Sequence, residues 1–391
     1  MLGSDTVVLF ISHDATRTGA PIVLLHLLRW LKRNTQVVPV VLLQSGGELE
    51  EEFRAVGETH IWSLPVSTTL WQNRYDRLTD KIGKHKRRIQ SRLKQLNLSL
   101  IYANTVVSAE LGIELKSVLN CPLVCHVHEL QTIIQESVGK DKFTRLSTQI
   151  DHFLGVSEAV CANLRQGHEI PAAKISKVFE FVPVLEPRQF AEASQQVRQE
   201  LGIPADAFLA LGAGTLDWRK SPALFIQIAQ HLQHLEGRPV YCIWMGGQLS
   251  DYNGLRVYYD LERVHLENTL RFVGSKANPH DYINAADVFV LTSREDPYPL
   301  VCLEAASLHK PVLCFADSGG MPEFVSQDCG IVVPYLRSDL MAQAIVRLRD
   351  DAALHQRLGT NAALTMRANH TVDTTAPLIH QIILRVVTQN M

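Results

Sequence analysis

Two acidic residues follow an apolar, strand-like run in the second half of the sequence. Asp296 lies in the loop REDPYP after VFVLTS, and Glu304 lies in the apolar run that comes next. Pro299 is suited to the first position of a helix, and the amides after it would form an anion site because a helix N-terminus carries about half a positive charge. Carboxylates that accept from hydroxyls, beside an anion site, suit a ligand with a phosphate and several hydroxyls. Solvated loop acids near a helix start are the alternative.

A basic pair follows another strand-like run. In LGAGTLDWRKSPALF, the run FLALGAG leads into Arg219 and Lys220 at an expected helix start. Cations beside free amides can neutralise a departing diphosphate. A nucleotide-activated sugar has the phosphates and hydroxyls that both loops would bind, whereas two solvated basic residues on a first helical turn are the plain alternative.

The glycines of the same stretch also allow a dinucleotide-binding interpretation. Gly212 and Gly214 follow a strand, but Asp217 stands where the third glycine is needed. The next strand ends in Met245-Gly246-Gly247 rather than in an acid that would hold ribose, which disfavours NAD.

The first half offers weaker signals. Gly19 follows ISHDATRT, where the backbone would turn tightly or approach a ligand closely. In CPLVCHVHEL, strand alternation separates the cysteines from the histidines, so we expect no metal site, and His128 at the strand end can face a ligand or simply pack. In GVSEAV, Ser157 is better interpreted as a helix N-cap than as a nucleophile.

Residues 74–94 are strongly basic, with nine lysines and arginines against two aspartates. Such a segment suits an anionic membrane surface or an anionic acceptor, although a solvated helix would have the same pattern. The whole chain has a formal net charge of only -2, which gives no general case for nucleic-acid binding.

The elements that would position these residues alternate between short apolar runs and amphipathic segments, which indicates βαβ units with buried parallel sheets. A chain of 391 residues exceeds one ordinary core, so we expect two doubly wound domains with a cleft between them. The predicted boundaries are 1–184 for the first domain, 185–204 for a linker that runs into a short helix, 205–366 for the second domain and 367–391 for a final helix.

The composition, 46% hydrophobic and 20% charged, is that of an ordinary folded protein. The seven scattered cysteines are expected to be reduced core residues, and the N-terminus lacks the features of a signal peptide. These features predict a cytoplasmic protein.

Taken together, the loops resemble glycosyltransferase family 4, the retaining nucleotide-sugar transferases of GT-B fold. The resemblance is densest in LGAGTLDWRKSPALF, FVGS, NAADVFVLTSREDPYPLVCLEAASLHKPVLCFADSGGMPEFV and GIVVP, and sparser in TGAP, CHVHEL and DHFLGVSEAV. Its most specific element is an acid, seven residues and a glutamate, here Asp296 to Glu304.

The resemblance implies roles for individual residues. Asp296 would reach the donor sugar, Glu304 the ribose diol, and His128 the transferred sugar. The diphosphate would meet Lys220, Arg219, the backbone of Tyr298, Pro299 and Leu300, and the loop of Gly19, while Phe272, Val273 and Gly274 would lie near the base. The final helix would cross back to the first domain, which would bind the acceptor.

The implied reaction moves a sugar from a nucleotide-sugar donor to a hydroxyl acceptor with retention of configuration, without metal or cofactor. The sequence departs from the family pattern at three places. Asp296 replaces the usual glutamate, GAG lacks a frequent arginine, and Glu180-Phe181 replaces Asn-Gly. The shorter Asp296 and the missing arginine motivate another hypothesis, a nucleotide-sugar-binding protein that has lost transfer. A GT-B-type sugar-nucleotide epimerase is a third hypothesis.

Overall fold

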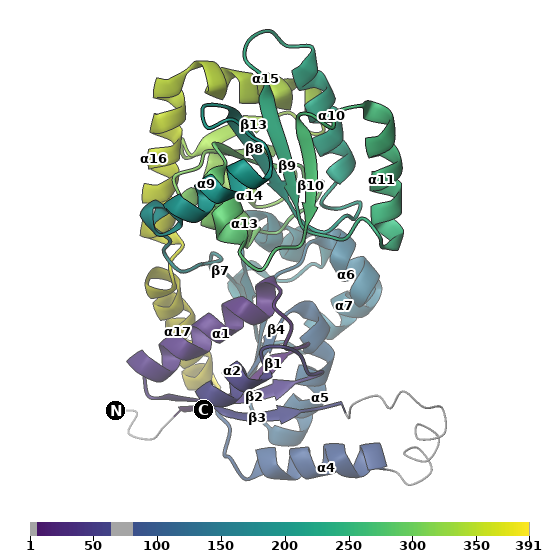
Figure 1. The fold of residues 1–391 in the computed structure, drawn as a ribbon. Helices are drawn as coiled ribbons and strands as arrows, with labels where there is room; N and C mark the ends of the chain where they lie inside the picture. Colours follow the sequence, from purple (N-terminus) through teal and green to yellow (C-terminus); the bar gives the residue numbers. More distant parts are fainter. Residues whose placement is uncertain (1–5, 64–80, 391) are drawn as a thin grey trace. The chain divides into compact units, whose positions relative to one another are not determined.

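The computed structural model describes residues 6–63 and 81–390 (Figure 1). Its internal contacts divide the chain into two compact units. Unit 1 comprises the described residues up to Glu180 together with those from Val372 onward, and unit 2 comprises Phe181–Thr371. Each unit is built around one all-parallel sheet, so the prediction of two doubly wound α/β domains is confirmed.

The described residues of unit 1 form a seven-stranded sheet in the order β3-β2-β1-β4-β5-β6-β7. The strand order reverses between β1 and β4, so the loops after these strands flank a topological switch point, where ligands of doubly wound sheets bind. The strands are β1 (Thr6–Ser12), β2 (Val37–Leu43), β3 (Glu58–Ile61), β4 (Leu100–Asn104), β5 (Leu123–Val127), β6 (His152–Gly155) and β7 (Ile175–Lys177).

The last helix of the chain belongs to unit 1. In α17 (Val372–Gln389), Asp373 accepts a hydrogen bond from Trp30 of α1 at 3.0 Å, and Arg385 donates to Ser176 of β7 at 3.2 Å. Figure 1 shows α17 beside α1, as expected for a final helix that crosses back. The other described helices of unit 1 are α1 (Gly19–Asn34), α2 (Glu50–Val56), α4 (Lys81–Lys94), α5 (Ala109–Leu119), α6 (Gln131–Ser137), α7 (Lys140–Ser147), α8 (Glu158–Ala162), the short 3₁₀ helices η1 (Val106–Ser108) and η3 (Ala172–Lys174), and the π-helix η2 (Asn163–Gly167).

The sheet of unit 2 has six strands in the order β10-β9-β8-β11-β12-β13. Here the order reverses between β8 and β11, which are hydrogen-bonded neighbours. The loops that follow these two strands carry the basic pair and Asp296. The strands are β8 (Phe208–Ala213), β9 (Val240–Met245), β10 (Leu270–Gly274), β11 (Val288–Leu291), β12 (Val312–Phe315) and β13 (Gly330–Val333).

The helices of unit 2 are the short 3₁₀ helix η4 (Pro187–Phe190), α9 (Ala191–Glu200), α10 (Pro222–Gln233), α11 (Tyr252–Val264), α12 (Pro279–Ala285), α13 (Leu300–Ser307), α14 (Met321–Val325), α15 (Ser338–Asp350) and α16 (Ala352–Asn369). The segment 185–204 contains α9, which packs against α12. There Ser194 donates to the carbonyl of Asp281 at 3.2 Å.

Strands β4 and β5 of the first sheet and β11 and β12 of the second are buried along their whole length, which explains why they appear in the sequence as continuous apolar runs rather than as alternating patterns. All seven cysteines are buried and none forms a disulfide. Within residues 6–63 and 81–390, no helix combines the length and apolar character that a membrane span requires.

The predicted basic segment is only partly described. Residues 74–80 lie outside the described residues, whereas 81–94 form α4. This helix is anchored by the buried side chains of Ile89 and Leu93. Its exposed face carries cationic residues, namely Lys84, Arg87, Arg88, Arg92 and Lys94.

Candidate functional site

The loops after β8 and β11 are joined at the switch point of unit 2. The side chain of Thr292 donates to the carbonyl of Lys220 at 2.9 Å, and the amide of Arg294 donates to the carbonyl of Arg219 at 2.8 Å. The side chain of Asp217 accepts from the Lys220 amide at 2.8 Å and fixes the turn before α10. These bonds hold the basic pair against the loop that contains Asp296.

Asp296 lies at the centre of a cluster of polar side chains. Its Oδ2 accepts hydrogen bonds from Nζ of Lys220 at 2.6 Å and from Oγ of Ser293 at 2.9 Å, and it lies 3.3 Å from Nη1 of Arg219. Burial of this carboxyl, which is 3% exposed, raises its pKa. The charges of Lys220 and Arg219 outweigh that effect, so the pKa of Asp296 lies below its ordinary value and the group is a carboxylate at neutral pH.

The backbone of Asp296 is fixed by the loop after β12. Its amide donates to the carbonyl of Ser318 at 2.7 Å, and its carbonyl accepts from the amide of Gly320 at 3.0 Å. Gly319, between them, has φ +121°, and a Cβ there would lie 1.9 Å from the Asp296 carbonyl oxygen. Only glycine allows this close approach.

Glycines at three neighbouring strand ends shape the space beside Lys220. A Cβ at Gly214 would lie 2.8 Å from Cγ of Lys220, so the absent side chain makes room for the lysine stem. The amide of Gly246 donates to the carbonyl of Gly274 at 2.8 Å, and a Cβ at Gly246 would lie 2.5 Å from the carbonyl oxygen of Gly214. These contacts connect the ends of β8, β9 and β10.

The structure places the predicted base-proximal residues on β10. The ring of Phe272 stacks on Trp244 with centroids 5.9 Å apart. The ladder between β10 and β9 is irregular at Val273, and Gly274 has φ +70°. This strand end therefore has an unusual backbone, although the aromatic face of Phe272 packs against its own sheet.

The predicted helix start differs slightly from the observed one. Pro299 has extended backbone, with ψ 123°, and occupies the N-cap position, so α13 begins at Leu300. The carbonyl of Pro299 accepts from Cys302 at 3.1 Å. Tyr298 is buried, its ring stacked on His370 and its hydroxyl 3.3 Å from Nε2 of that histidine. Its backbone, rather than its hydroxyl, is therefore the part suited to contact a ligand.

Glu304 lies in α13, and its side chain is 25% exposed. Its Oε1 is 3.6 Å from Nε2 of His280 on α12. The hydrogen bond that His280 donates to Glu304 is the main cause that raises the pKa of His280. Glu304 thus keeps an accessible carboxylate with a histidine beside it.

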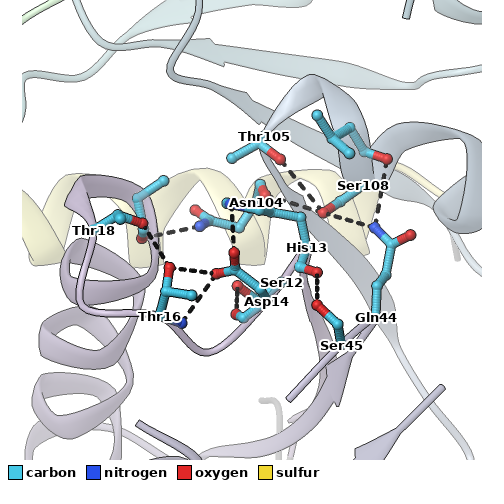
Figure 2. Close-up of polar contacts among 12 residues, drawn as sticks. Ser12, His13, Asp14, Thr16, Thr18, Gln44, Ser45, Asn104, Thr105 and Ser108 are labelled. Carbon is cyan, nitrogen blue, oxygen red and sulfur yellow. Dashed lines mark hydrogen bonds and ion pairs between the residues drawn. The ribbon is translucent and has the colours of Figure 1, made fainter. Parts of the chain in front are cut away.

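In unit 1, side-chain hydrogen bonds fix the loop between β1 and α1 (Figure 2). Oδ1 of Asp14 accepts from the amide of Thr16 at 3.1 Å and from its hydroxyl at 2.9 Å, and that hydroxyl lies 3.0 Å from Oγ1 of Thr18. On the neighbouring strand β4, Asn104 donates to the carbonyl of Ala20 at 3.0 Å. Gly19 is the first residue of α1 and lies between these contacts.

His128 has an internal partner at each ring nitrogen. Nδ1 lies 2.6 Å from Oε1 of Glu180, and Nε2 lies 3.1 Å from Oδ1 of Asn104. The side chains of His128 and Glu180 are both 7% exposed. Burial lowers the pKa of His128, but the charge and hydrogen bond of Glu180, with a contribution from Glu129, raise it above the ordinary value.

Glu129 is a second buried carboxyl at this strand end. Its oxygens lie 3.3 Å from the amide of Val106, and Oε2 accepts from the amide of His128 at 2.9 Å. Burial raises the pKa of Glu129 to about 7. Sequence reasoning overlooked Glu129 and Ser293, although each is a polar residue two positions after the end of a strand, which is the signal that could have found them.

Two sequence-family comparisons cover most of the chain. Residues 17–183 match the family described as Glycosyltransferase Family 4, and residues 193–365 match the family described as Glycosyl transferases group 1. The chain belongs to glycosyltransferase family 4.

Relatives of this family member include glycosyltransferases with different names. It is 29% identical over 170 residues to the lipopolysaccharide core biosynthesis glycosyltransferase LpsD of Rhizobium meliloti, a match that covers 44% of this chain and 47% of LpsD. It is 25% identical over 284 residues to the D-inositol 3-phosphate glycosyltransferase of Streptomyces bingchenggensis, which covers 68% of this chain and 62% of that protein. The chain therefore spans about half to two thirds of the length of these relatives.

Solved structures resemble this glycosyltransferase family member over nearly its whole length. Anabaena HepE in complex with UDP-glucose has a TM-score of 0.79 at 19% identity and covers 97% of this chain and 99% of that chain. Sucrose-phosphate synthase from Thermosynechococcus elongatus has a TM-score of 0.77 at 19% identity, with 98% and 100% covered. At these identities the likeness establishes the GT-B fold.

Proposed function

We propose that this protein is a retaining glycosyltransferase that moves a sugar from a nucleotide-sugar donor to a hydroxyl acceptor without a metal ion. Unit 2 binds the donor and unit 1 binds the acceptor. The observation that carries the proposal is the cluster at the switch point of unit 2, where Lys220 and Arg219 lie against the buried carboxylate of Asp296. Membership of the family and the names of its relatives support the same reaction class.

The cluster suits the electrostatic demand of sugar transfer. Negative charge develops on the leaving diphosphate. The ammonium of Lys220, held by Asp296, and the guanidinium of Arg219, held by the carbonyl of Glu295, can stabilise this charge without reorganising. Amides at the start of α13, from Leu300 onward, can accept a phosphate. The diphosphate then assists the incoming hydroxyl on the same face of the sugar, so configuration is retained.

Glu304 supplies the acceptor that a ribose diol needs. Its partly exposed carboxylate lies within α13, beyond the turn that would meet the diphosphate. HepE, whose fold this chain shares, has been solved in complexes with UDP, with UDP and glucose, and with UDP-glucose. On that basis a UDP-sugar is the first donor to test.

Transfer is tested by incubating the protein with UDP-, GDP- and ADP-sugars, each with a pool of glycan and lipid acceptors. Acceptor-dependent release of nucleotide diphosphate, unchanged by EDTA, and a product with the donor's anomeric configuration are expected. Binding without any release would instead favour a nucleotide-sugar-binding protein that has lost transfer. Release of nucleotide without need for an acceptor would favour an epimerase.

The basic face of α4 motivates a further element of the proposal, peripheral contact with an anionic membrane at the cytoplasmic side. Lys86 lies over the ring of Trp62, 5.0 Å from its centroid, and Arg92 pairs with Glu58 at 2.8 Å. Arg87, Arg88 and Arg92 all lie on the exposed face of α4. Co-sedimentation with vesicles of anionic phospholipid, and loss of that binding in an Arg87→Glu, Arg88→Glu variant, would support it.

A further inference from the structure

The hydrogen bonds around His128 constrain its protonation state. Asn104 donates its amide nitrogen to the carbonyl of Ala20 at 3.0 Å, and this bond orients the amide so that Oδ1 faces Nε2 of His128. Reversing the amide would place its oxygen against the carbonyl oxygen of Ala20, where neither atom can donate. Nε2 of His128 therefore faces an acceptor.

The other ring nitrogen of His128 also faces an acceptor, Oε1 of Glu180, at 2.6 Å. A neutral imidazole carries one N–H and one bare nitrogen, so it can satisfy only one of these two acceptors. An imidazolium donates at both nitrogens and satisfies Asn104 and Glu180 together. The geometry is that of a cation.

The other titratable groups that face His128 are compatible with this charge. Glu180 comes from the segment after β7, and Glu129 follows β5; both are acids that favour a cation. His126 on β5 has its ring centroid 4.1 Å away, and burial lowers its pKa well below the ordinary value. His13, after β1, also has a lowered pKa, mainly through burial. Both neighbouring histidines are therefore neutral at pH 7.

We propose that Glu180 is a positioning residue that holds His128 as a buried imidazolium, with both N–H groups turned into unit 1. His128 then acts on a bound ligand through its positive charge and ring edge rather than by donating a hydrogen bond to a sugar. Its effect on transfer rests on the proposed function. The protonation state of His128 does not rest on the proposed function, and it can be measured without any substrate.

The decisive variant is Glu180→Gln, because the glutamine amide can donate to Nδ1 while Nε2–H still donates to Asn104. The pocket stays hydrogen-bonded around a neutral ring, so the melting temperature should change little. Glu136→Gln, at an exposed position of α6, is the matched control. Glu180→Asp keeps the negative charge and should keep the ring charged.

The protonation state is measured by ¹⁵N NMR of histidine-labelled protein at pH 7, with His128→Gln used to assign the signal. The wild type and the Glu180→Asp variant should show two protonated ring nitrogens at His128, and Glu180→Gln should show one bare nitrogen. A bare nitrogen at His128 of the wild type at pH 7 overturns the proposal. A doubly protonated ring in Glu180→Gln also overturns the role of Glu180.

Transfer gives a second readout. Between pH 7 and 8, kcat of Glu180→Gln should be about tenfold below that of the wild type with KM for the donor unchanged, and Glu180→Asp should restore most of it. Below pH 6 the difference in kcat between the two proteins should become smaller, because the His128 ring of Glu180→Gln gains a proton. If kcat of the wild type and of Glu180→Gln depends on pH in the same way, the proposed effect of Glu180 on transfer is overturned. If neither the wild type nor any variant releases nucleotide diphosphate, the proposed function fails. The NMR result still decides the protonation state of His128.

Discussion

Nζ of Lys220 lies 2.6 Å from Oδ2 of Asp296, and this contact joins the loop after β8 to the loop after β11. The Asp296 carboxylate therefore forms an ion pair with Lys220 in the structure. A carboxylate that uses Oδ2 to hold two cations is suited to fix their positions for a diphosphate. A shorter acid than the family's usual glutamate suffices for this, because Lys220 and Arg219 lie within 3.3 Å of it.

Replacing Lys220 by alanine should lower kcat/KM for the donor by about 10²–10³-fold, because a fixed charge-assisted donor to the leaving group is lost. Arg219 and Ser293 still contact Asp296, so unit 2 should stay folded with a melting temperature a few degrees lower. Nucleotide diphosphate release and calorimetric titration with UDP measure the effect. Lys276→Ala, at an exposed position of unit 2, is the control and should leave both unchanged.

Replacing Gly319 by alanine should destabilise unit 2 by about 1–3 kcal/mol or more and displace Asp296. Two features of Gly319 cause this loss. Its φ is +121°, and an added Cβ would lie 1.9 Å from the Asp296 carbonyl oxygen. Gly202→Ala is the matched control, since φ there is +64° but no atom lies within 4 Å of the added Cβ. Urea unfolding compares the two variants; equal losses would show that the contact with Asp296 is unimportant.

Much of this arrangement follows from the sequence, because the site residues stand directly after apolar runs. Buried parallel strands must deliver their following loops to one edge of a sheet, which predicts that the loops of Lys220 and Asp296 meet. That the two side chains touch could not be predicted. The contact exists because β8 and β11 are adjacent, hydrogen-bonded strands, and it joins residues 76 positions apart.

The partner of His128 shows a different limit. Glu180 follows β7, a strand of three residues, and lies 52 positions from His128. Strand alternation predicted on which side the histidines lie, but not the orientation of the imidazole within its pocket. The sequence marked Glu180 only as a departure from the family pattern, and the structure shows which group that departure contacts.

Replacing Glu304 by glutamine should weaken binding of a nucleoside diphosphate about tenfold, because a neutral amide is a poorer acceptor for a ribose diol than a carboxylate. His280→Gln is the control, since it removes the neighbouring histidine and leaves the acceptor in place. Calorimetric titration with UDP distinguishes them. Similar losses in both variants would show that the pair, rather than the carboxylate of Glu304, determines affinity.

Ionisation of Glu129 should lower the free energy of unfolding of unit 1 as the pH rises. Its pKa is raised from 4.5 to about 7 in the fold, so the folded state holds a proton that the unfolded chain has already released. The stability contribution is complete below about pH 4.5 and is lost as pH approaches and passes 7, up to about 3 kcal/mol. Glu129→Gln should remove this dependence.

The measurement is the midpoint of urea unfolding at pH 5 and at pH 8 for the wild type, Glu129→Gln and the exposed control Glu136→Gln. The wild type and the control should lose stability between the two pH values by the same amount, and Glu129→Gln should lose less. Parallel curves for all three proteins would show that Glu129 ionises as easily in the fold as in the unfolded chain.

Protonation of His152 should have the opposite pH dependence, because it lowers the stability of unit 1 as the pH falls. It should also weaken the packing of α17 against the sheet at acidic pH. Its Nε2 lies 2.9 Å from Oγ of Ser176 and 3.3 Å from Nη2 of Arg385. Burial, with the charge of Arg385, lowers the pKa of His152 to about 4. The unfolded chain therefore binds a proton at pH values where the folded protein does not, so stability falls as pH decreases from about 6.5 to 4.

His152→Gln retains a side chain that can bond Ser176 but cannot gain a charge. Amide hydrogen exchange in α17 should accelerate between pH 6.5 and 5 in the wild type, after correction for the intrinsic pH dependence of exchange, and change less in the variant. His265→Gln, at an exposed position of unit 2, should behave as the wild type. If α17 of the wild type is equally protected at both pH values, protonation of His152 does not control this helix, and the contact with Arg385 at 3.3 Å tolerates a charged imidazole.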